Sequence, residues 1–263
     1  MYSSNMRIPD KPGRPNAVKS DVTVAQILHS LHEKRLAGVT EIANHIDRPK
    51  STVHNHLSTL QSAGLVVKQD GKYALSLQFL EYGETARRRR MNHGIIKENV
   101  RNLAAQTGER VQYIVEERNL AVYLFIATGE KAVTTDSRIG RHISLHATSA
   151  GKSILANLPE RKRELILEKT PLSEHTRNTI TAPDELAAEL ETIRERGYAT
   201  NREEHTRGLR AVGVPVMGPE ENVLGAISVS GPTHRMKGDR FEEEIPNLLL
   251  AATNEIELTI TFD

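Results

Sequence analysis

Three breaks, at Gly38, Pro49 and Gly64, divide the N-terminal third of the sequence into short segments with apolar residues at helical spacing. The apolar residues of the first two segments are Val24, Ile27, Leu28, Leu31, Ile42, Ala43 and Ile46. Pro49 suits the first turn of a helix, because its missing N–H has no partner there anyway. Gly64 suits the end of the same helix. The pattern predicts three consecutive helices, with Thr40 capping the second.

A tight hairpin is predicted directly after the third helix. Two short β-rich runs flank Asp70-Gly71, a dipeptide that favours a two-residue turn. Two short helices joined by a short turn and followed by a hairpin make up the winged helix-turn-helix layout. The predicted organisation is a disordered arm over 1–20, this domain over 21–76, and a linker helix over 77–93 that carries four consecutive arginines.

The predicted third helix, residues 50–62, has an outer face of short side chains that form hydrogen bonds. Val53, Leu57 and Leu60 share its inner face, because residues at these spacings lie above one another on a helix. The outer face and first turn carry Lys50, Ser51, Thr52, His54, Asn55 and Ser58. Asn pairs bidentately with adenine, and Ser and Thr reach bases or phosphates. An isolated helix of this kind would be a solvated surface, but the turn before it and the hairpin after it favour DNA reading, with Lys72 beside the DNA backbone.

The net charge also differs between the predicted DNA-binding part with its linker and the rest of the chain. Residues 1–90 carry 14 Lys and Arg against 8 Asp and Glu, whereas residues 91–263 carry 21 against 26. A basic first part on an acidic remainder indicates that the first part meets a polyanion. The absence of cysteine excludes disulfides and thiolate metal sites. No apolar run approaches the roughly 18–20 residues of a membrane span, and the N-terminus lacks a secretory apolar core, so a cytoplasmic protein with no membrane partner is expected.

The remaining two thirds, residues 94–263, predict an α+β sandwich with an antiparallel sheet and helices outside it. The run IIKENVRNLAAQT predicts a helix closed by Gly108, and two β-rich runs around Arg118-Asn119 predict a hairpin. Further strands are expected near 132–137, 198–204, 209–217 and 223–230, and helices near 148–157, 160–168 and 184–196.

The run DRPKSTVHNHLSTLQSAGLVVKQDGKYALS (47–76) resembles the DNA-binding domain of the IclR family of transcriptional regulators. Successive signatures of that family's effector-binding domain follow in the family's order, as SRIGRHISLHATSAGKSILA (137–156), RNTITAPDELAAELETIRERGYA (177–199), EEHTRGLRAVGVPV (203–216) and GAISVSGPTHR (225–235). The resemblance covers roughly residues 22–255, and STVHNHLSTL looks most like archaeal members. It implies a regulator of transcription with a GAF- or PAS-like effector domain, acting as a homodimer or homotetramer on double-stranded DNA with a pseudo-palindromic operator.

The resemblance also implies a pocket for a small carboxylate. In the family, backbone N–H groups at a helix start, an acidic side chain, a Cys and two serines on the last strand hold the ligand. The matching positions in this sequence are Ser149, Ala150, Asn201, Ala211, Ser228 and Ser230. Asn201 is neutral where the family has an acid, and Ala211 is small where it has Cys. We therefore expect an organic acid larger or more hydroxylated than a two- or three-carbon keto acid, such as a sugar acid or an aromatic acid.

Two other kinds of function stay open at this point. The chain could be a DNA-binding protein whose second domain serves only oligomerisation, or, more distantly, a small-molecule enzyme. The run SAGKS (149–153) resembles the end of a phosphate-binding loop, but His146 stands where that loop needs its first glycine. His142, His146, His205 and His234 could be metal ligands, but among them only His142 and His146 have a suitable spacing, and these two are expected on an irregular connection between a strand and a helix. Exposed or hydrogen-bonded histidines are favoured, and no nucleophile lies at a recognisable spacing from a base. The sequence thus predicts no catalytic residue, cofactor or metal.

Overall fold

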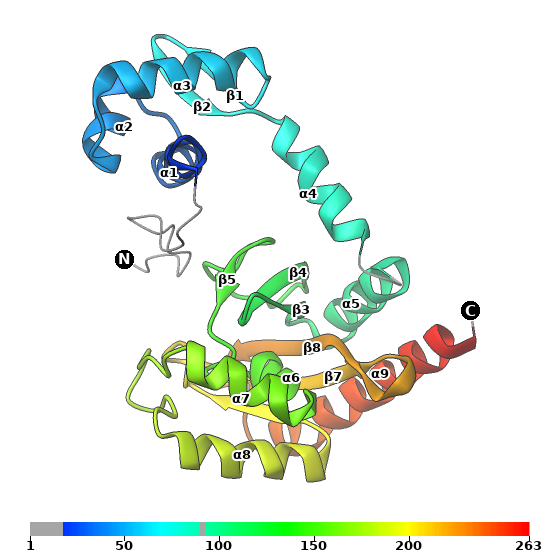
Figure 1. Ribbon diagram of the computed structural model, residues 1–263. Coiled ribbons are helices and arrows are strands. Elements are labelled where there is room, and N and C mark those ends of the chain that lie inside the picture. The colour runs from blue at the N-terminus through cyan, green and yellow to red at the C-terminus, as the bar shows by residue number, and fades with distance from the viewer. Residues whose placement is uncertain (1–17, 90–92, 263) are drawn as a thin grey trace. The chain divides into compact units, whose positions relative to one another are not determined.

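The computed structural model describes residues 18–89 and 93–262, and each of these two stretches forms its own compact unit. The elements of the first unit are α1 (Lys19–Lys34), α2 (Val39–Ile46), α3 (Lys50–Ser62), β1 (Val66–Gln69), β2 (Lys72–Leu75) and α4 (Gln78–Arg88). This is the expected winged helix-turn-helix order (Figure 1). Of the predicted arm, residues 1–17 lie outside the described residues. Lys19 and Ser20 already belong to α1, so the arm was predicted too long.

The apolar side chains that the sequence places at helical spacing meet in one core. Its buried members are Ile27, Leu31, Ala37, Ile42, Ala43, Val53, Leu57, Leu60, Val66 and Tyr73. Each fully buried aliphatic side chain stabilises the fold by about 1.5–3 kcal/mol. Helices as short as α2 are marginal in isolation. The helices α1–α3 and the hairpin therefore hold their shape as a set, and the surface of α3 is fixed by its buried face.

The turns of the first unit follow the sequence signals. Asp70 and Gly71 have φ values of 47° and 77°, as a two-residue turn with two left-handed residues requires. Gly64 follows α3 with a φ of 75°, and the Leu65 N–H donates to the Leu60 carbonyl over 2.9 Å. The hairpin and the end of the predicted DNA-reading helix are thus confirmed.

The start of α2 differs from the prediction. The helix begins at Val39 with Gly38 as its N-cap, and the Glu41 carboxylate accepts the Gly38 N–H over 2.7 Å. Thr40 is therefore inside the helix rather than at its cap. The Glu41 carboxylate accepts the backbone N–H of the N-cap residue itself, which is the second half of a capping box, so the helix begins at a glycine that has no hydroxyl. The Thr40 prediction was wrong.

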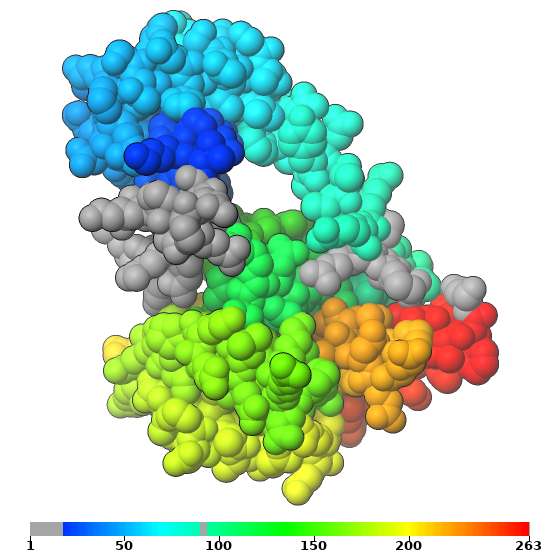
Figure 2. Space-filling model, in the orientation of Figure 1, coloured from blue at the N-terminus to red at the C-terminus, as the bar shows by residue number. Residues whose placement is uncertain are grey.

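Apolar side chains of α4 and its N-cap are left uncovered. Leu77 is 82% exposed and Leu80 is 70% exposed, and no residue of α4 is buried. In the space-filling view α4 projects as a narrow column from the body formed by α1–α3 (Figure 2). The linker helix predicted over 77–93 is shorter in the structure. It ends at Arg88, residues 90–92 lie outside the described residues, and a separate helix begins at His93.

The second unit is built on one antiparallel sheet. Its helices and strands are α5 (His93–Thr107), β3 (Arg110–Glu117), β4 (Leu120–Thr128), β5 (His142–Ile143), α6 (Ser149–Asn157), α7 (Glu160–Lys169), α8 (Pro183–Arg196), β6 (Ala199–Arg202), β7 (Leu209–Met217), β8 (Val223–Pro232) and α9 (Ile245–Phe262). The strand order is β5-β4-β3-β8-β7-β6, and each neighbouring pair is antiparallel. This is the expected α+β sandwich.

Helices cover both faces of this sheet (Figure 1). Val111, Tyr113 and Val115 of β3 face a core shared with α5 and α9. Ile114 faces the opposite core, which is shared with α6 and α8. Because side chains alternate along a strand, Arg110 and Gln112 lie on the same face as Ile114. Polar residues of the strands therefore reach the α6 face of the sheet.

The strand expected near 132–137 is absent. This prediction was wrong, and residues 129–141, here called the strap, run without regular structure to β5. Its β-branched residues suggested a strand, but single contacts hold its backbone in place of a ladder. The Lys131 N–H donates to the Gly108 carbonyl over 2.8 Å, and the Ser137 carbonyl accepts from the Arg110 side chain over 2.7 Å.

Helix α9 was not predicted from the sequence. Its segment IPNLLLAATNEIELTITF buries Leu249, Ile256 and Ile260 against the sheet, so the helical spacing was present. The dense apolar run obscured that spacing, because nearly every position could count as inward. Among the described residues, none of the helices combines the length and hydropathy that a membrane span needs.

Candidate functional site

The side chains predicted to read DNA gather on one open face of α3. Val53, Leu57 and Leu60 are buried as expected. Lys50, Ser51, His54, Asn55 and Ser58 are exposed, and Thr52 is partly exposed. Within the described part of the chain, none of these six side chains donates or accepts a hydrogen bond or forms an ion pair. Their donors and acceptors are therefore available to a partner.

The first turn of α3 adds backbone donors to this face. Pro49 is the N-cap and no side chain caps the helix, whose first internal bond runs from the Val53 N–H to the Pro49 carbonyl over 3.1 Å. Backbone N–H groups at a helix start favour a phosphate. Lys50 lies in the same turn, and Lys72 is exposed at the start of β2. Groups suited to phosphates and groups suited to base edges are thus exposed together at the start and on the outer face of α3.

A cavity of about 230 Å³ lies in the second unit, next to the start of α6, the strap and the strands β6, β7 and β8. Of the predicted effector residues, those that line it are Ser149, Asn201, Ala211, Ser228 and Ser230. Ala150 does not line the cavity, because its methyl group is buried in the core between α6 and the sheet. Other polar residues that line the cavity were not predicted as effector contacts, and they include Gln112, Tyr123, Arg141, His205 and Arg210.

The floor of the cavity is a closed polar network on the central strands. Ser228 is 3% exposed and lies opposite Gln112 in the β3–β8 pairing. The Ser228 hydroxyl donates to the Gln112 Oε1 over 2.8 Å, and the Gln112 Nε2 donates to the Ser230 Oγ over 2.7 Å. The two serines face the same way, as their spacing on one strand predicts. Gln112 fixes both hydroxyls and leaves the rest of their hydrogen-bonding capacity for a ligand.

The start of α6 is held close to the sheet at this floor. The Thr148 hydroxyl caps the helix by accepting the Gly151 N–H over 3.1 Å. A side chain on Gly213 of β7 would place its Cβ 2.7 Å from the Ala150 nitrogen, and one on Gly151 would meet the Leu145 carbonyl oxygen at 2.1 Å. Both glycines are therefore required by close backbone approach. The first N–H groups of α6 lie beside the serine network.

Asn201 closes the side of the cavity next to β7. It is buried, pairs with Ala211 across β6 and β7, and its Nδ2 donates to the Ala147 carbonyl over 2.6 Å. That bond orients the amide and turns one of its polar ends toward the helix start. A neutral amide here presents no negative charge to a bound acid, and Ala211 leaves the adjoining space open.

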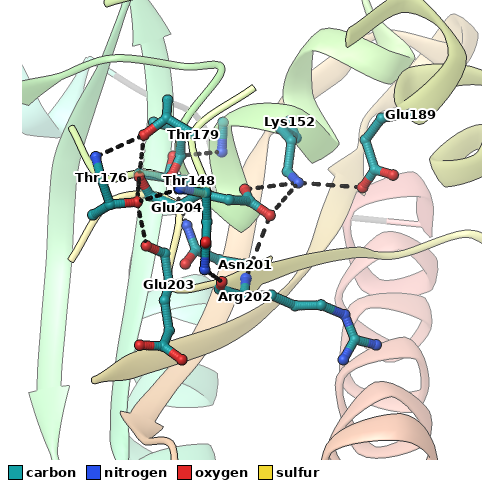
Figure 3. Close-up of polar contacts among 12 residues, drawn as sticks. Thr148, Lys152, Thr176, Thr179, Glu189, Asn201, Arg202, Glu203 and Glu204 are labelled. Atoms are coloured by element: carbon teal, nitrogen blue, oxygen red, sulfur yellow. Dashed lines mark hydrogen bonds and ion pairs between the residues drawn. The ribbon is translucent and has the colours of Figure 1, made fainter. Parts of the chain in front are cut away.

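A buried lysine ties the wall of the cavity to two helices (Figure 3). Lys152 of α6 is 1% exposed. Its Nζ lies 2.8 Å from the Glu204 Oε2 and 3.2 Å from the Glu189 Oε1 of α8. Burial raises the pKa of Glu204, and the lysine opposes that effect. A buried charge with its partner removed costs several kcal/mol, so this ion pair holds the turn after β6 against α6.

The turn after β6 is also held from outside. The Thr176 hydroxyl donates to the Glu203 carbonyl over 2.7 Å, and the Thr179 hydroxyl donates to the Glu204 carbonyl over 2.7 Å. Figure 3 shows both threonines on the side of the turn away from Lys152. The next two residues, His205 and Thr206, line the cavity. The wall is therefore a braced turn rather than a free loop.

Three histidines stack behind this wall. The ring centroids of His146 and His175 lie 5.9 Å apart, and those of His175 and His205 lie 5.1 Å apart. Burial lowers the pKa of each, and it lowers the pKa of His205 to about 4, with the neighbouring His175 contributing. At neutral pH the three rings are uncharged. Among the described residues, no group of three or more His, Asp or Glu has an arrangement suited to a metal ion.

Both parts of the chain match known domain families. Residues 23–70 match the IclR helix-turn-helix domain. Residues 92–258 match the C-terminal domain of bacterial IclR transcriptional regulators. The chain belongs to the IclR family. It is accordingly a DNA-binding transcriptional regulator with a C-terminal effector-binding domain.

Relatives and a solved structure agree with this assignment over nearly the whole chain. A probable HTH-type transcriptional regulator ArcR from Halobacterium salinarum is 32% identical, over 94% of this chain and 96% of that protein. The HTH-type transcriptional regulator KdgR from Escherichia coli is 32% identical, over 92% of this chain and 93% of that protein. The crystal structure of IclR from Thermotoga maritima superposes with a TM-score of 0.75 at 30% identity, covering 92% of this chain and 97% of that one.

Proposed function

We propose that this IclR-family regulator binds a pseudo-palindromic operator as a homodimer or homotetramer, in the cytoplasm, and that a small organic acid in the cavity changes its affinity for DNA. A two-fold protein reads two-fold half-sites. The hypothesis assigns DNA contacts to Lys50, Ser51, Thr52, His54, Asn55, Ser58 and Lys72. It assigns effector contacts to Ser149, Ala150, Asn201, Ala211, Ser228 and Ser230, with Ala150 acting through its backbone N–H.

The arrangement of polar groups at the cavity floor is the main support for the proposed acid site. A helix start favours an anion, and here it lies beside two serine hydroxyls that Gln112 already orients. A scaffold that only joined subunits would gain nothing from a buried polar cavity, because buried polar groups cost free energy unless they are bonded. The arrangement therefore supports an acid that completes the remaining hydrogen bonds of the floor.

The size and lining of the cavity narrow the class of acid. A volume of about 230 Å³ is smaller than the roughly 300–1,000 Å³ of drug-sized sites. Many of the lining side chains are hydroxyls or amides, which suit a hydroxylated ligand, while Ile114, Ile143 and Leu209 offer apolar contact. A sugar acid or a small aromatic acid matches both features. Among the described lining residues, the Thr206 hydroxyl lies 3.0 Å from the His205 Nδ1, so a hydroxyl group does stand beside a base. Binding without catalysis is therefore supported by the family of the chain and not by the absence of such a pair.

The experiment is a screen of organic, sugar and aromatic acids by thermal shift, followed by DNA binding with and without each acid that binds. The double variant Ser228→Ala with Ser230→Ala removes both partners of Gln112. It should abolish the response of DNA binding to the acid, while binding to DNA without acid stays within about twofold, because α3 lies in the other unit.

The double variant leaves the buried Gln112 amide without its serine partners, at a cost of about 1–3 kcal/mol of stability. Its folding is therefore checked by circular dichroism at the assay temperature. Ser173→Ala, at an exposed serine of the same unit outside the cavity, is the control. A full response to the acid in the double variant would contradict the proposed site.

A further inference from the structure

The cavity and its immediate surroundings carry more positive than negative charge. Arg141 and Arg210 line it, and the only carboxylate among the described lining residues is that of Asp136. Arg110 abuts the same space, since it bonds to Ser137 of the strap and lies next to Ser230 in the sheet. The guanidinium group of Arg210 lies over Phe241 in the opposite core. The guanidinium groups of Arg110 and Arg141 thus stand against one carboxylate. The stacked histidines add no charge at neutral pH.

Arg110 is placed on the cavity face by the pleat of β3. It lies two residues before Gln112 and opposite Ser230, and strand alternation turns Arg110 and Gln112 to the same side. It is 6% exposed. A buried guanidinium group therefore lies beside the floor network on the same face of the sheet.

The donors of Arg110 are poorly satisfied within the chain. One Nη2 donates to the neutral Ser137 carbonyl over 2.7 Å, while the buried Nε has no hydrogen-bond partner. Among residues 18–89 and 93–262, no Asp or Glu forms an ion pair with it. Taking a guanidinium out of water without an anion is costly. No acidic side chain of the described chain offsets the cost of burying the Arg110 guanidinium, and a bound anion would offset it.

The other cations of the cavity differ in what they already hold. Arg141 already forms an ion pair with Asp136, whose side chain is 66% exposed. Arg210 donates to the Met236 carbonyl over 3.2 Å, and its guanidinium carbon lies 5.5 Å from the centre of the Phe241 ring. Met236 and Phe241 belong to the core on the other face of the sheet, so the charge of Arg210 points away from the cavity floor. Arg110 is therefore the cation on the cavity face whose buried donor has no partner in the described chain.

The same unit shows how the chain treats a buried charge that has only a structural role. Glu109, adjacent to Arg110 in sequence, is fully buried and meets Arg235 through two contacts of 2.8 Å. Arg240 approaches the same carboxylate at 3.6 Å. That pair is complete without any ligand. Arg110 has no such counter-ion, although it lies one residue away on the opposite face of the strand.

We propose that the effector of this regulator is a diacid, with one acid group at the start of α6 and the serines and the second neutralised by Arg110 on the side of the strap. The hydrogen-bond donors at the start of α6 and the serines suit one acid group, and a second acid group supplies the counter-ion that the buried Arg110 lacks in the described chain. The inference rests on the proposed function and narrows it to a ligand class. Arg110 is the residue that selects diacids over monoacids.

The test compares matched acids on the full chain by isothermal titration calorimetry. The pairs are succinate with butyrate, glutarate with valerate, adipate with hexanoate, phthalate with benzoate, and galactarate with galactonate. At least one diacid should bind about tenfold or more tightly than its monoacid partner, which corresponds to about 1.4 kcal/mol. Equal affinity within every pair, or no binding by any diacid, would overturn the inference. This comparison needs no variant and so does not depend on a mutant folding.

Arg110→Met keeps much of the side-chain volume and removes the charge. This variant should lower the affinity for the preferred diacid by about tenfold or more and change the affinity for the matched monoacid by less than about threefold. Arg138→Met removes the same charge from an exposed position of the strap that does not line the cavity, and should change neither. A diacid preference that survives Arg110→Met would remove Arg110 from the site.

The outcomes for DNA separate this inference from the proposed function. If a monoacid alone alters DNA binding, the proposed function stands and the diacid inference fails. If a diacid binds through Arg110 but DNA binding never responds, ligand recognition stands and the regulatory role of the cavity fails.

Discussion

The outer face of α3 and the floor of the cavity are both made of short polar side chains, but they use them in opposite ways. On α3, Asn55 and Ser58 are exposed and have no partner in the described chain. In the floor, Ser228 and Ser230 are bonded to Gln112 across two strands. An open face can adapt to a large and variable partner. Because the groups of the floor already bond to one another, the floor accepts only a ligand whose hydrogen-bonding groups match the donors and acceptors that remain.

This difference predicts how each region responds to substitution. Removing an exposed side chain from α3 takes away a contact with the partner and costs the fold little, because nothing inside the chain depended on it. Removing a floor residue leaves a buried group unbonded and costs both stability and binding. Substitutions on the outer face of α3 should therefore change binding without changing stability. Substitutions in the cavity floor should change both.

The largest expected effect is a loss of stability from a substitution on the buried face of α3. Leu57 is fully buried, and Leu57→Ala should destabilise the first unit by about 2–5 kcal/mol. Calorimetry should show one unfolding transition moving to lower temperature, with DNA binding reduced and acid binding retained. Thr59→Ala, at an exposed position of the same helix, is the control. Loss of acid binding in Leu57→Ala would mean that the two units do not unfold separately.

The outer face of α3 should show a smaller and more specific effect. If Asn55 contacts a base, Asn55→Ala should cost about 1–3 kcal/mol on the best operator and relax the preference at one base pair. Lys50→Ala should weaken binding to every sequence alike, because a phosphate contact carries no sequence information. Both are measured by fluorescence anisotropy on the operator and on point-substituted operators. An unchanged affinity in Asn55→Ala would place α3 differently in the groove.

The stability of the second unit should depend on pH through the cavity wall. The pKa of His205 falls from about 6.5 unfolded to about 4 folded, so its contribution to stability is present above pH 6.5 and is lost as the pH falls toward 4. By pH 5.5 the loss should be on the order of 1 kcal/mol. His205→Asn should reduce this dependence in thermal unfolding of the second unit, and the part that remains comes from His146 and His175, whose pKa values burial also lowers. His234→Asn, at an exposed histidine, should leave it unchanged, and a dependence that His205→Asn does not alter would assign it to another group.

The smallest effect is expected at the hairpin. Lys72→Ala should lower the slope of log affinity against log salt by about 0.9, the share of one phosphate contact, with little change in sequence preference. Lys169→Ala, at the end of α7 in the other unit, should leave the slope unchanged. A slope that Lys72→Ala does not change would place the hairpin away from the DNA backbone.

The two regions also differ in how far their residues could be predicted from the sequence. The face of α3 follows from local periodicity, because the positions of Val53 and Leu57 determine which side chains turn outward. Ser228 and Ser230 could be placed on one strand face by the same argument. Gln112 could not be joined to them, since the pairing of β3 with β8 brings together residues 116 positions apart. Arg141 and the strap were missed because the segment before β5 has no repeating pattern.

The close backbone contacts at Gly151 and Gly213 have a mechanical consequence. They leave no space between the start of α6, the Leu145 backbone and β7, so this corner of the cavity cannot yield when a ligand enters. The strap has a contact of this kind only at its first residue, Gly129, and residues 132–137 that follow are held by single hydrogen bonds, among them the one from the Arg110 side chain to the Ser137 carbonyl. We therefore expect entry of an acid to displace residues 132–137 of the strap more than the start of α6. Distance measurements between spin labels on the strap and on α8 would record that displacement directly.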